Sequence, residues 1–232
     1  MKKKLVVFTG AGISASSGLA TFRGANGLWE GYKIEEVATP EAWHNNPQLV
    51  TDFYNERRIS VVGAKPNKAH LKLCEFESNW DVKIITQNID DLHERAGSKY
   101  VVHLHGEILK MRSQKDETLF YEVTEKNNYC MTLDDKCPYG YSWRPHVVWF
   151  GEPVPKMELA IDLVTQAHVF LVIGTSLQVY PAASLVHHVD RTVPIILVDP
   201  EADNLNVGSS IRKIVANAEE GMVQVEKLLE TF

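Results

Sequence analysis

The sequence of 232 residues has little cysteine, no surplus of positive charge and no long apolar run. Three cysteines, an odd number in a chain of this length, do not indicate a disulfide framework. A net charge of −6 argues against a nucleic-acid-binding protein, whose affinity comes from Lys and Arg opposite phosphates. The basic start is followed by an apolar run too short for a signal peptide, and no stretch reaches membrane-spanning length. We therefore expect a cytoplasmic protein without nucleic-acid or membrane partners.

The chain does contain short, continuous apolar runs, each followed by a polar cluster. The runs are residues 5–8, 82–86, 169–174 and 194–198. Such runs are typical of parallel strands that are buried on both faces. Helical patterns alternate with them, at residues 67–76, 156–167, 182–189 and 221–229. This alternation predicts a doubly wound α/β fold with its ligand at the carboxyl ends of the strands.

Two stretches, residues 20–63 and 107–145, interrupt the alternation. The first is a loop followed by a helix, and the second is polar, turn-rich and aromatic. We expect these insertions to pack together as a small second module. The large domain would then consist of residues 1–19, 64–106 and 146–232.

The first apolar run ends in a glycine-rich turn typical of phosphate binding. Gly10, Gly12 and Ala15 form the pattern G-x-G-x-x-A, and Ser14 adds a hydroxyl donor. Such turns also occur for steric reasons alone. Glu30, about 20 positions on, lies in an insertion and not at a strand end, where a dehydrogenase has its ribose-binding acid. The sequence favours a nucleotide ligand but not hydride transfer.

Six motifs occur in one order along the chain. They are GAGISASSGLATFRG (10–24), TQNIDDLH (86–93), HLHG (103–106), RPHVVWFGE (144–152), GTSLQVYPAA (174–183) and VDPE (198–201). Together they resemble the sirtuin family of NAD-dependent protein-lysine deacylases over nearly the whole chain. The resemblance implies a Rossmann-like large domain and a cleft in which NAD meets an acyl-lysine peptide. NAD would be consumed, releasing nicotinamide and O-acyl-ADP-ribose.

The resemblance assigns catalytic roles to residues that follow two of the strands. Gln87, Asn88 and Asp90 match family positions that grip nicotinamide and the adjacent ribose. His105 matches the general base, and a histidine suits this role because its unperturbed pKa of about 6.5 allows proton exchange near neutral pH. On a strand, His103 and His105 would face the same side, so spacing alone does not separate them. The motif favours His105 as the base and His103 as a structural residue.

Other positions match the binding sites of the cofactor and the peptide. The cofactor positions are Gly10, Ala11, Gly12, Ser14, Phe22, Arg23, Gly174, Thr175, Ser176, Asp199 and Ala218. Phe22 would shield the reactive ribose from water, although core packing explains a phenylalanine equally well. Val148, Phe150 and Gly151 would pair edge-on with the peptide main chain. A buried strand also explains this apolar segment.

Residues 48–62 have the pattern of an amphipathic helix with an arginine inside its apolar stripe. The stripe runs through Val50, Phe53, Tyr54, Arg57 and Val61. A buried arginine needs an anionic partner, whereas Arg58, off the stripe, is expected to be solvated. Tyr54 and Arg57 also match the Tyr-x-x-Arg pattern of the sirtuin branch that removes succinyl and malonyl groups. The alternative partner for Arg57 is a glutamate of this chain.

The chain retains one of the four cysteines that hold a structural zinc in most sirtuins. The resemblance places the four ligands at Ser113, Asp116, Cys137 and Gly140. Cys130 lies outside the ordinary spacing from Cys137. We therefore predict no bound zinc. We expect aromatic residues to form a core in its place: Phe120, Tyr121, Tyr129, Tyr139, Tyr141 and Trp143.

The resemblance thus predicts a monomeric NAD-dependent protein-lysine deacylase that favours succinyl and malonyl over acetyl groups. The alternative is a mono-ADP-ribosyltransferase that uses the same NAD site and passes ribose to a protein nucleophile. The intact HGE motif and the pair Tyr54 and Arg57 favour deacylation. A non-catalytic sensor would be indicated by degenerate catalytic motifs, and these motifs are intact.

Overall fold

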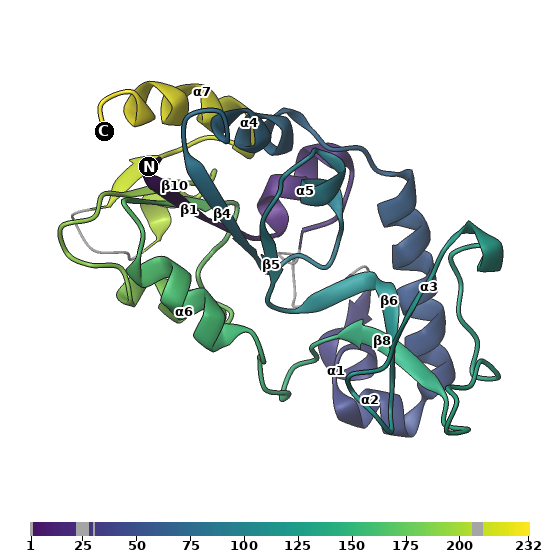
Figure 1. The fold of residues 1–232 in the computed structure, drawn as a ribbon. Helices are drawn as coiled ribbons and strands as arrows, with labels where there is room; N and C mark the ends of the chain where they lie inside the picture. Colours follow the sequence, from purple (N-terminus) through teal and green to yellow (C-terminus); the bar gives the residue numbers. More distant parts are fainter. Residues whose placement is uncertain (1, 22–27, 30, 206–210) are drawn as a thin grey trace.

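The computed structural model describes residues 2–21, 28–29, 31–205 and 211–232, and at its centre is a parallel sheet. Six strands lie in the order β11-β10-β9-β1-β4-β5 (Figure 1). They are β1 (Lys4–Thr9), β4 (Asp81–Thr86), β5 (Val101–His103), β9 (Val169–Ile173), β10 (Ile195–Val198) and β11 (Arg212–Ile214). The predicted doubly wound sheet is confirmed, and all four apolar runs form strands in it.

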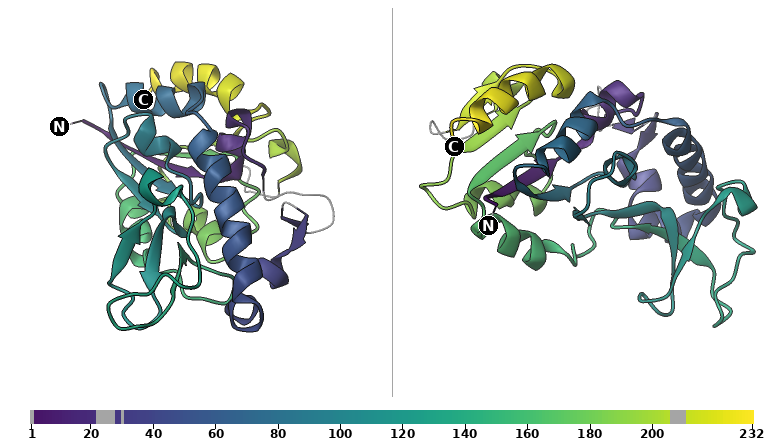
Figure 2. Two further views of the ribbon diagram at one scale, coloured as in Figure 1. Left: turned by 90° about the vertical axis from the view of Figure 1, so that its right-hand side faces the viewer. Right: turned by 45° about the horizontal axis from the view of Figure 1, so that its top comes forward.

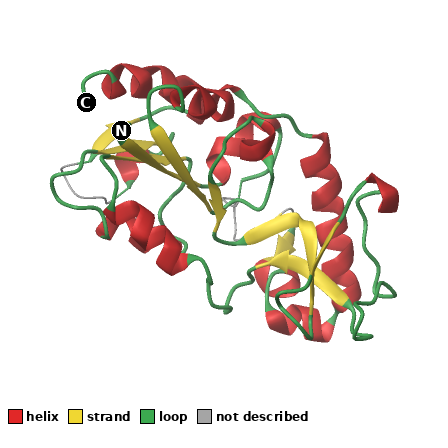
Figure 3. Cartoon of the chain, viewed as in Figure 1, coloured by secondary structure: helices red, strands yellow, loops and turns green. Residues whose placement is uncertain are grey.

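Helices cover both faces of this sheet, which explains why the strands are apolar throughout. Successive side chains of a strand point to opposite faces. Val7 of β1 packs with residues of α4 (Lys68–Phe76) and α7 (Ala218–Leu229), whereas Phe8 packs with residues of α6 (Met157–Thr165). Figures 1 and 3 show α4 and α7 on one side of the sheet and α6 on the other.

Three of the predicted helices are α-helices, and the fourth is of another type. The pattern at residues 182–189 forms a 3-10 helix, η3 (Ala182–His187). The glycine-rich turn after β1 leads into another 3-10 helix, η1 (Ala11–Ser17). Two short helices, α5 (Leu92–Arg95) and η4 (Ala202–Asn204), follow β4 and β10. No helix in the described part of the chain is long and apolar enough to cross a bilayer.

Beside the parallel sheet lies a smaller unit with an antiparallel sheet in the order β7-β6-β8 (Figures 1 and 2). Its strands are β6 (Gly106–Ser113), β7 (Phe120–Glu122) and β8 (Trp143–Val147), and η2 (Glu125–Asn127) follows β7. The first insertion contributes β2 (Leu28–Trp29), β3 (Tyr32–Lys33), α1 (Ile34–Val37), α2 (Pro40–Asn45) and α3 (Pro47–Gly63). The small sheet was not predicted, because its residues are polar and rich in turns. The exact division into two domains stays a prediction.

The expected aromatic core of the small sheet is wrong. The buried cluster there consists of Met111, Val123, Met131, Cys137 and Trp143. Four of the other candidates, Phe120, Tyr121, Tyr139 and Tyr141, are 46–57% exposed. Phe120 and Tyr121 lie on β7, which is an edge strand, and Tyr139 and Tyr141 flank Gly140 in a turn. At both places the aromatic rings are in contact with solvent. Trp143 alone among the six candidates belongs to this cluster, which is otherwise aliphatic and sulfur-containing.

Arg58 was expected to be solvated, and this expectation is wrong. The side chain is fully buried, and its burial lowers the pKa of Arg58 to about 10. Its Nε donates to the Ile108 carbonyl at 2.8 Å, and its Nη1 donates to Asn55 Oδ1 at 2.7 Å and to the Tyr129 carbonyl at 3.2 Å. The helix α3 therefore has buried side chains beyond one stripe, because the second insertion packs against it as well.

Candidate active site

The floor of the candidate site is formed where β1 and β9 end, and it has no room for side chains. The Gly12 N–H donates to the Gly174 carbonyl at 2.9 Å. A Cβ on Gly12 would lie 2.6 Å from the Cα of Gly174, and one on Gly10 would lie 2.7 Å from the Cβ of Thr175. Gly174 also has a φ of +62°, in the left-handed region that glycine tolerates. The steric explanation therefore holds for these glycines, whichever ligand lies above them.

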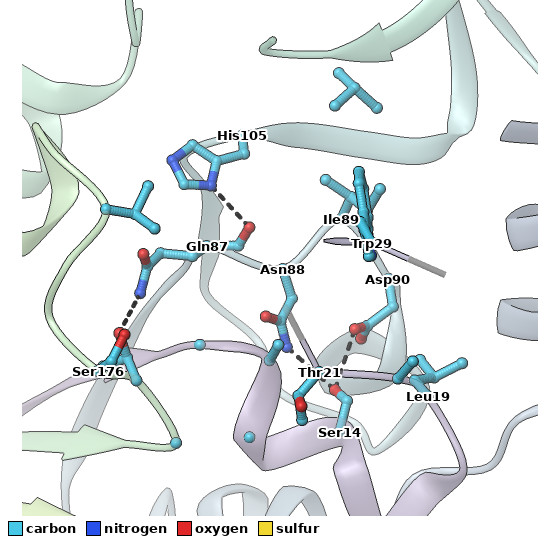
Figure 4. Close-up of a pocket in the computed structure, with 18 of the residues that line it drawn as sticks. Ser14, Leu19, Thr21, Trp29, Gln87, Asn88, Ile89, Asp90, His105 and Ser176 are labelled. Atoms are coloured by element: carbon cyan, nitrogen blue, oxygen red, sulfur yellow. Dashed lines mark hydrogen bonds between the residues drawn. The ribbon is translucent and has the colours of Figure 1, made fainter. Parts of the chain in front are cut away.

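Three polar side chains, one from η1 and two from the loop after β4, form one hydrogen-bonded chain beside this floor (Figure 4). Asn88 Nδ2 donates to Ser14 Oγ at 3.1 Å, and Ser14 Oγ donates to Asp90 Oδ2 at 3.1 Å. Burial raises the pKa of Asp90, while hydrogen bonds from the Leu92 N–H and from Ser14 act in the opposite direction. The structure thus brings two predicted nicotinamide-binding residues together with the glycine-rich turn.

His105 lines the same cavity, and one hydrogen bond fixes its tautomer (Figure 4). Its Nδ1 lies 3.0 Å from the Gln87 carbonyl, which can only accept, so Nδ1 carries the proton and Nε2 is the acceptor. Burial lowers the pKa of His105, so the imidazole is neutral at pH 7. Gly106 has a φ of +85°, and a Cβ there would lie 2.2 Å from the His146 carbonyl. This glycine lets β6 begin directly after the histidine.

His103 does not share a strand face with His105, so the spacing argument is wrong. The strand β5 ends at His103, and the two rings line different cavities. His103 Nδ1 lies 2.9 Å from the Asn88 carbonyl, and Nε2 lies 2.8 Å from Glu94 Oε1. Of the two histidines, only His105 lines the cavity formed by the glycine-rich turn, a distinction that sequence spacing could not give.

Tyr54 and Arg57, one turn apart on α3, both line the cavity. Tyr54 is fully buried, and its hydroxyl accepts a hydrogen bond from Trp149 Nε1 at 3.0 Å. Burial raises the pKa of Tyr54, so the phenol stays protonated and can donate in turn. The guanidinium of Arg57 lies 4.7 Å from the ring centre of Trp29 and 5.9 Å from that of Phe53. A phenol and a guanidinium thus share one wall of the cavity.

The segment of residues 148–151 also lines the cavity, and its backbone is already partly bonded. The N–H of Val148 donates to the His105 carbonyl at 2.9 Å, and that of Phe150 donates to the Ala38 carbonyl at 3.0 Å. A peptide that pairs with residues 148–151 would therefore bond to the carbonyl groups of this segment and to Gly151.

Glu152 holds this segment in place, and sequence reasoning missed it. Its carboxylate accepts hydrogen bonds from Arg112, from Arg144 and from the Trp149 N–H, at 2.6–3.2 Å. The Arg144 guanidinium also stacks 3.4 Å from the ring centre of Trp149. These contacts lower the pKa of Glu152 although burial raises it. Arg144 and Glu152 have opposite charges and flank the apolar part of RPHVVWFGE, and this is the sequence signal that could have indicated their ion pair.

The remaining predicted cofactor positions surround the same cavity, whose volume is about 410 Å³. They are Ala11, Gln87, Thr175, Ser176, Asp199 and Ala218. Gln87 Nε2 donates to Thr175 Oγ1 at 2.9 Å, and the buried Asp199 follows β10. A floor without Cβ atoms and a carboxylate at a neighbouring strand end fit the phosphates and a ribose of NAD. Phe22, Arg23 and Glu30 lie outside the described residues.

A hydrogen bond joins two of the four positions at which the sequence resemblance places zinc ligands. Ser113 Oγ donates to Cys137 Sγ at 3.2 Å. Burial raises the pKa of the Cys137 thiol, but hydrogen bonds from Ser113 and from the N–H groups of Tyr139 and Tyr141 lower it overall. No group of three His, Cys, Asp or Glu side chains in the described ranges could share a metal ion. The absence of zinc stays a prediction.

Comparisons with known proteins agree with this geometry. The sequence pattern described as the Sir2 family matches residues 10–181. The NAD-dependent protein deacylase of Helicobacter pylori (strain J99) is 50% identical over 229 residues, which cover 98% of this chain and 96% of that protein. The NAD-dependent protein deacylase of Bacteroides thetaiotaomicron is 47% identical and covers 98% of both chains.

Solved structures give the same result in three dimensions. A complex of a Sir2 homologue with NAD is similar with a TM-score of 0.87 and 39% identity, over 99% of this chain and 90% of that chain. A complex of Sir2 with a p53 peptide and NAD⁺ is similar with a TM-score of 0.79 and 29% identity, over 100% and 95% of the two chains.

Proposed function

The chain belongs to the Sir2 family and is an NAD-dependent protein deacylase, and on this premise we propose that it removes succinyl and malonyl groups in preference to acetyl groups. The pair Tyr54 and Arg57 on the cavity wall carries this proposal. A guanidinium binds a carboxylate through two parallel hydrogen bonds, and the phenol supplies a third. An acetyl group offers Arg57 no carboxylate, so acetyl-lysine would be turned over less well.

The polar groups around the floor would carry out the chemistry. Bound NAD supplies a ribose whose bond to nicotinamide can be broken and whose carbon then accepts the acyl oxygen. The hydrogen-bonded series from Asn88 through Ser14 to Asp90 would hold the nicotinamide end of NAD in a fixed, desolvated place. Asp90, which stays buried, would face the positive charge that develops on the ribose.

His105 would act as the general base. Its Nδ1 proton is committed to the Gln87 carbonyl, so Nε2 is the atom that would accept a proton from a ribose hydroxyl. The Gln87 carbonyl would also stabilise the imidazolium that forms, because this hydrogen bond acts to raise the pKa of His105 against the larger effect of burial. The products would be lysine, nicotinamide and O-acyl-ADP-ribose.

One peptide that bears acetyl-, succinyl- or malonyl-lysine in turn tests the acyl preference. Arg57→Met should lower kcat/KM for the succinyl peptide about 30-fold or more, because a buried partner of a charge is lost. Deacetylation should remain. Arg191→Met, at an exposed position of the large unit, is the control for loss of an arginine as such. Unchanged succinyl turnover in Arg57→Met would exclude a carboxylate site at Arg57 and favour its pairing with a glutamate of this chain.

The mono-ADP-ribosyltransferase alternative predicts other products from the same cavity. Analysis of the products by mass spectrometry separates the two activities: O-acyl-ADP-ribose indicates deacylation, and a protein modified by ADP-ribose indicates transfer. His105 lines the cavity with Nδ1 bonded to the Gln87 carbonyl and Nε2 as its acceptor, and this supports deacylation. We also propose that the protein is a cytoplasmic monomer that acts on acyl-lysine proteins, without nucleic-acid or membrane partners.

A further inference from the structure

Two imidazoles hold successive carbonyls of the loop that follows β4. His105 Nδ1 donates to the Gln87 carbonyl at 3.0 Å, and His103 Nδ1 donates to the Asn88 carbonyl at 2.9 Å. Their rings line different cavities. His105 is thus presented to the substrates, whereas His103, which is 4% exposed, contacts the loop from behind.

Asn88 is held at three points, and His103 supplies one of them. The Asn88 N–H donates to Thr86 Oγ1 at 3.0 Å, and the Asn88 side chain donates to Ser14 Oγ at 3.1 Å. The carbonyl bonds to His103, so rotation of the peptide group that joins Asn88 to Ile89 would break this contact. The hydrogen bond from His103 thus restrains the backbone between Asn88, which binds Ser14, and Asp90, which binds Ser14 as well.

Glu94 fixes His103 from the opposite side of its ring. Glu94 Oε1 lies 2.8 Å from His103 Nε2, and Glu94 belongs to α5, which begins directly after the loop. The loop, α5 and the end of β5 are thus joined through one imidazole. Both residues line the second cavity, and Asp90 lines both cavities.

We propose that His103 is the positioning residue of the nicotinamide loop, and that Glu94 holds its ring so that it binds the Asn88 carbonyl. The inference rests on the proposed role of Asn88 and Asp90 in the use of NAD. His103 does not touch the reacting atoms and acts through two loop residues, Asn88 by its hydrogen bond and Asp90 by its charge.

Charged groups around His103 strengthen this arrangement. Glu94 of α5, Asp90 and Asp91 of the loop, and Glu107 of β6 line the second cavity with it, as does Lys110, which pairs with Glu107. Burial lowers the pKa of His103, but Glu94, the Asn88 carbonyl and Glu107 together raise it overall, with Glu94 as the strongest of the three. The charge on His103 in turn lowers the pKa of Asp90, against the effect of its burial. The imidazolium thus serves both residues of the loop.

Variants at His103 separate positioning from simple structural support. His103→Leu removes both hydrogen bonds, and His103→Asn keeps an amide donor near the place of Nδ1. We expect His103→Leu to raise KM for NAD about tenfold, the value of one buried hydrogen bond, with KM for the acyl peptide changed less than about twofold. His103→Asn should restore most of the loss. An unchanged KM for NAD in His103→Leu, with a lower melting temperature, would overturn the proposal.

The pH profile tests the part played by Glu94. Glu94→Gln keeps a hydrogen-bonding partner but removes the charge that favours the imidazolium. The alkaline limb of kcat/KM for NAD should therefore move to lower pH. Glu107→Gln is the matched control in the same cavity, since Glu107 pairs with Lys110 at 2.9 Å, and it should move this limb less. Equal shifts in the two variants would contradict a specific role of Glu94.

Two further variants keep this inference distinct from the proposed function. Asn88→Ala should impair the use of NAD; if it does not, the assignment of the loop fails, and the inference fails with it. Impairment in Asn88→Ala together with normal kinetics in His103→Leu overturns the inference alone. His168→Asn should leave KM for NAD unchanged, because His168 contacts the Lys4 N–H where β1 and β9 begin, at the end of the sheet away from the loop.

Discussion

At the scale of single residues, His105 shows how a backbone carbonyl can set the chemistry of a side chain. The Gln87 carbonyl takes the Nδ1 proton, and this leaves Nε2 as the basic atom. Burial lowers the pKa of His105, which keeps the ring neutral over more of the pH range. The hydrogen bond and the lowered pKa together keep His105 Nε2 available to accept a proton at neutral pH.

The acid limb of the pH–rate profile should follow from this. We expect kcat/KM to fall as pH falls, with a midpoint below 6.5, because the imidazolium has no lone pair to accept a proton. His105→Asn should lower kcat by about 10²–10⁴. Initial rates across pH measure the midpoint, and circular dichroism at each pH separates titration from unfolding. A midpoint at or above 6.5 would contradict the direction of the shift.

Individual residues also mark where sequence reasoning reached its limit. The motifs identified His105, Asn88 and Asp90 correctly as neighbours in one cavity, because each follows the end of a parallel strand. Strand spacing could not distinguish the two histidines, because β5 ends at His103; only the motif favoured His105. Glu152 was missed because opposite charges within one motif do not by themselves predict an ion pair, and its contact with Arg112 on β6 is visible only in the fold.

At the scale of elements, α3 has two adjacent arginines with different surroundings. Arg57 lines the cavity, whereas Arg58 points from another face of α3 and binds the carbonyls of Ile108 and Tyr129. The stripe predicted from spacing assumed one buried face, as is usual for a surface helix. The second insertion covers another face of α3, and no periodicity in the sequence encodes that contact.

Replacement of Arg58 should therefore destabilise the fold. Arg58→Met removes the donor to the buried Ile108 carbonyl and to the partly buried Tyr129 carbonyl, and we expect the free energy of unfolding to fall by about 2–4 kcal/mol. Urea unfolding followed by fluorescence measures the change. Glu56→Met, at an exposed position of the same helix, is the matched control and should change stability little. A loss below about 0.5 kcal/mol for Arg58→Met would mean that its contacts contribute little to folding.

At the scale of the whole molecule, the large sheet was predictable and the small sheet was not. The parallel strands are buried on both faces, so each one is a continuous apolar run. The small sheet has one edge strand in which Phe120 and Tyr121 are exposed, and its strands show no such run. Its core, from Met111 to Trp143, gathers residues that are far apart in the sequence.

The small unit should hold its structure without a metal ion. Ser113 and Cys137 are joined by a hydrogen bond over a buried apolar cluster, so neither a chelator nor added zinc should change the melting temperature. Differential scanning calorimetry with and without EDTA measures this, together with metal analysis of the purified protein. Stoichiometric zinc, or a melting temperature that falls in EDTA, would refute the prediction.

The contact between Gly12 and Gly174 has a mechanical consequence for the enzyme as a whole. Two backbones meet there directly, with a hydrogen bond of 2.9 Å and no side chain between them that could change its rotamer. Such a main-chain contact is stiff, because close-packed protein interiors resist compression. We therefore expect this end of the cavity to keep its shape when NAD binds, since no side-chain rotation there could change it.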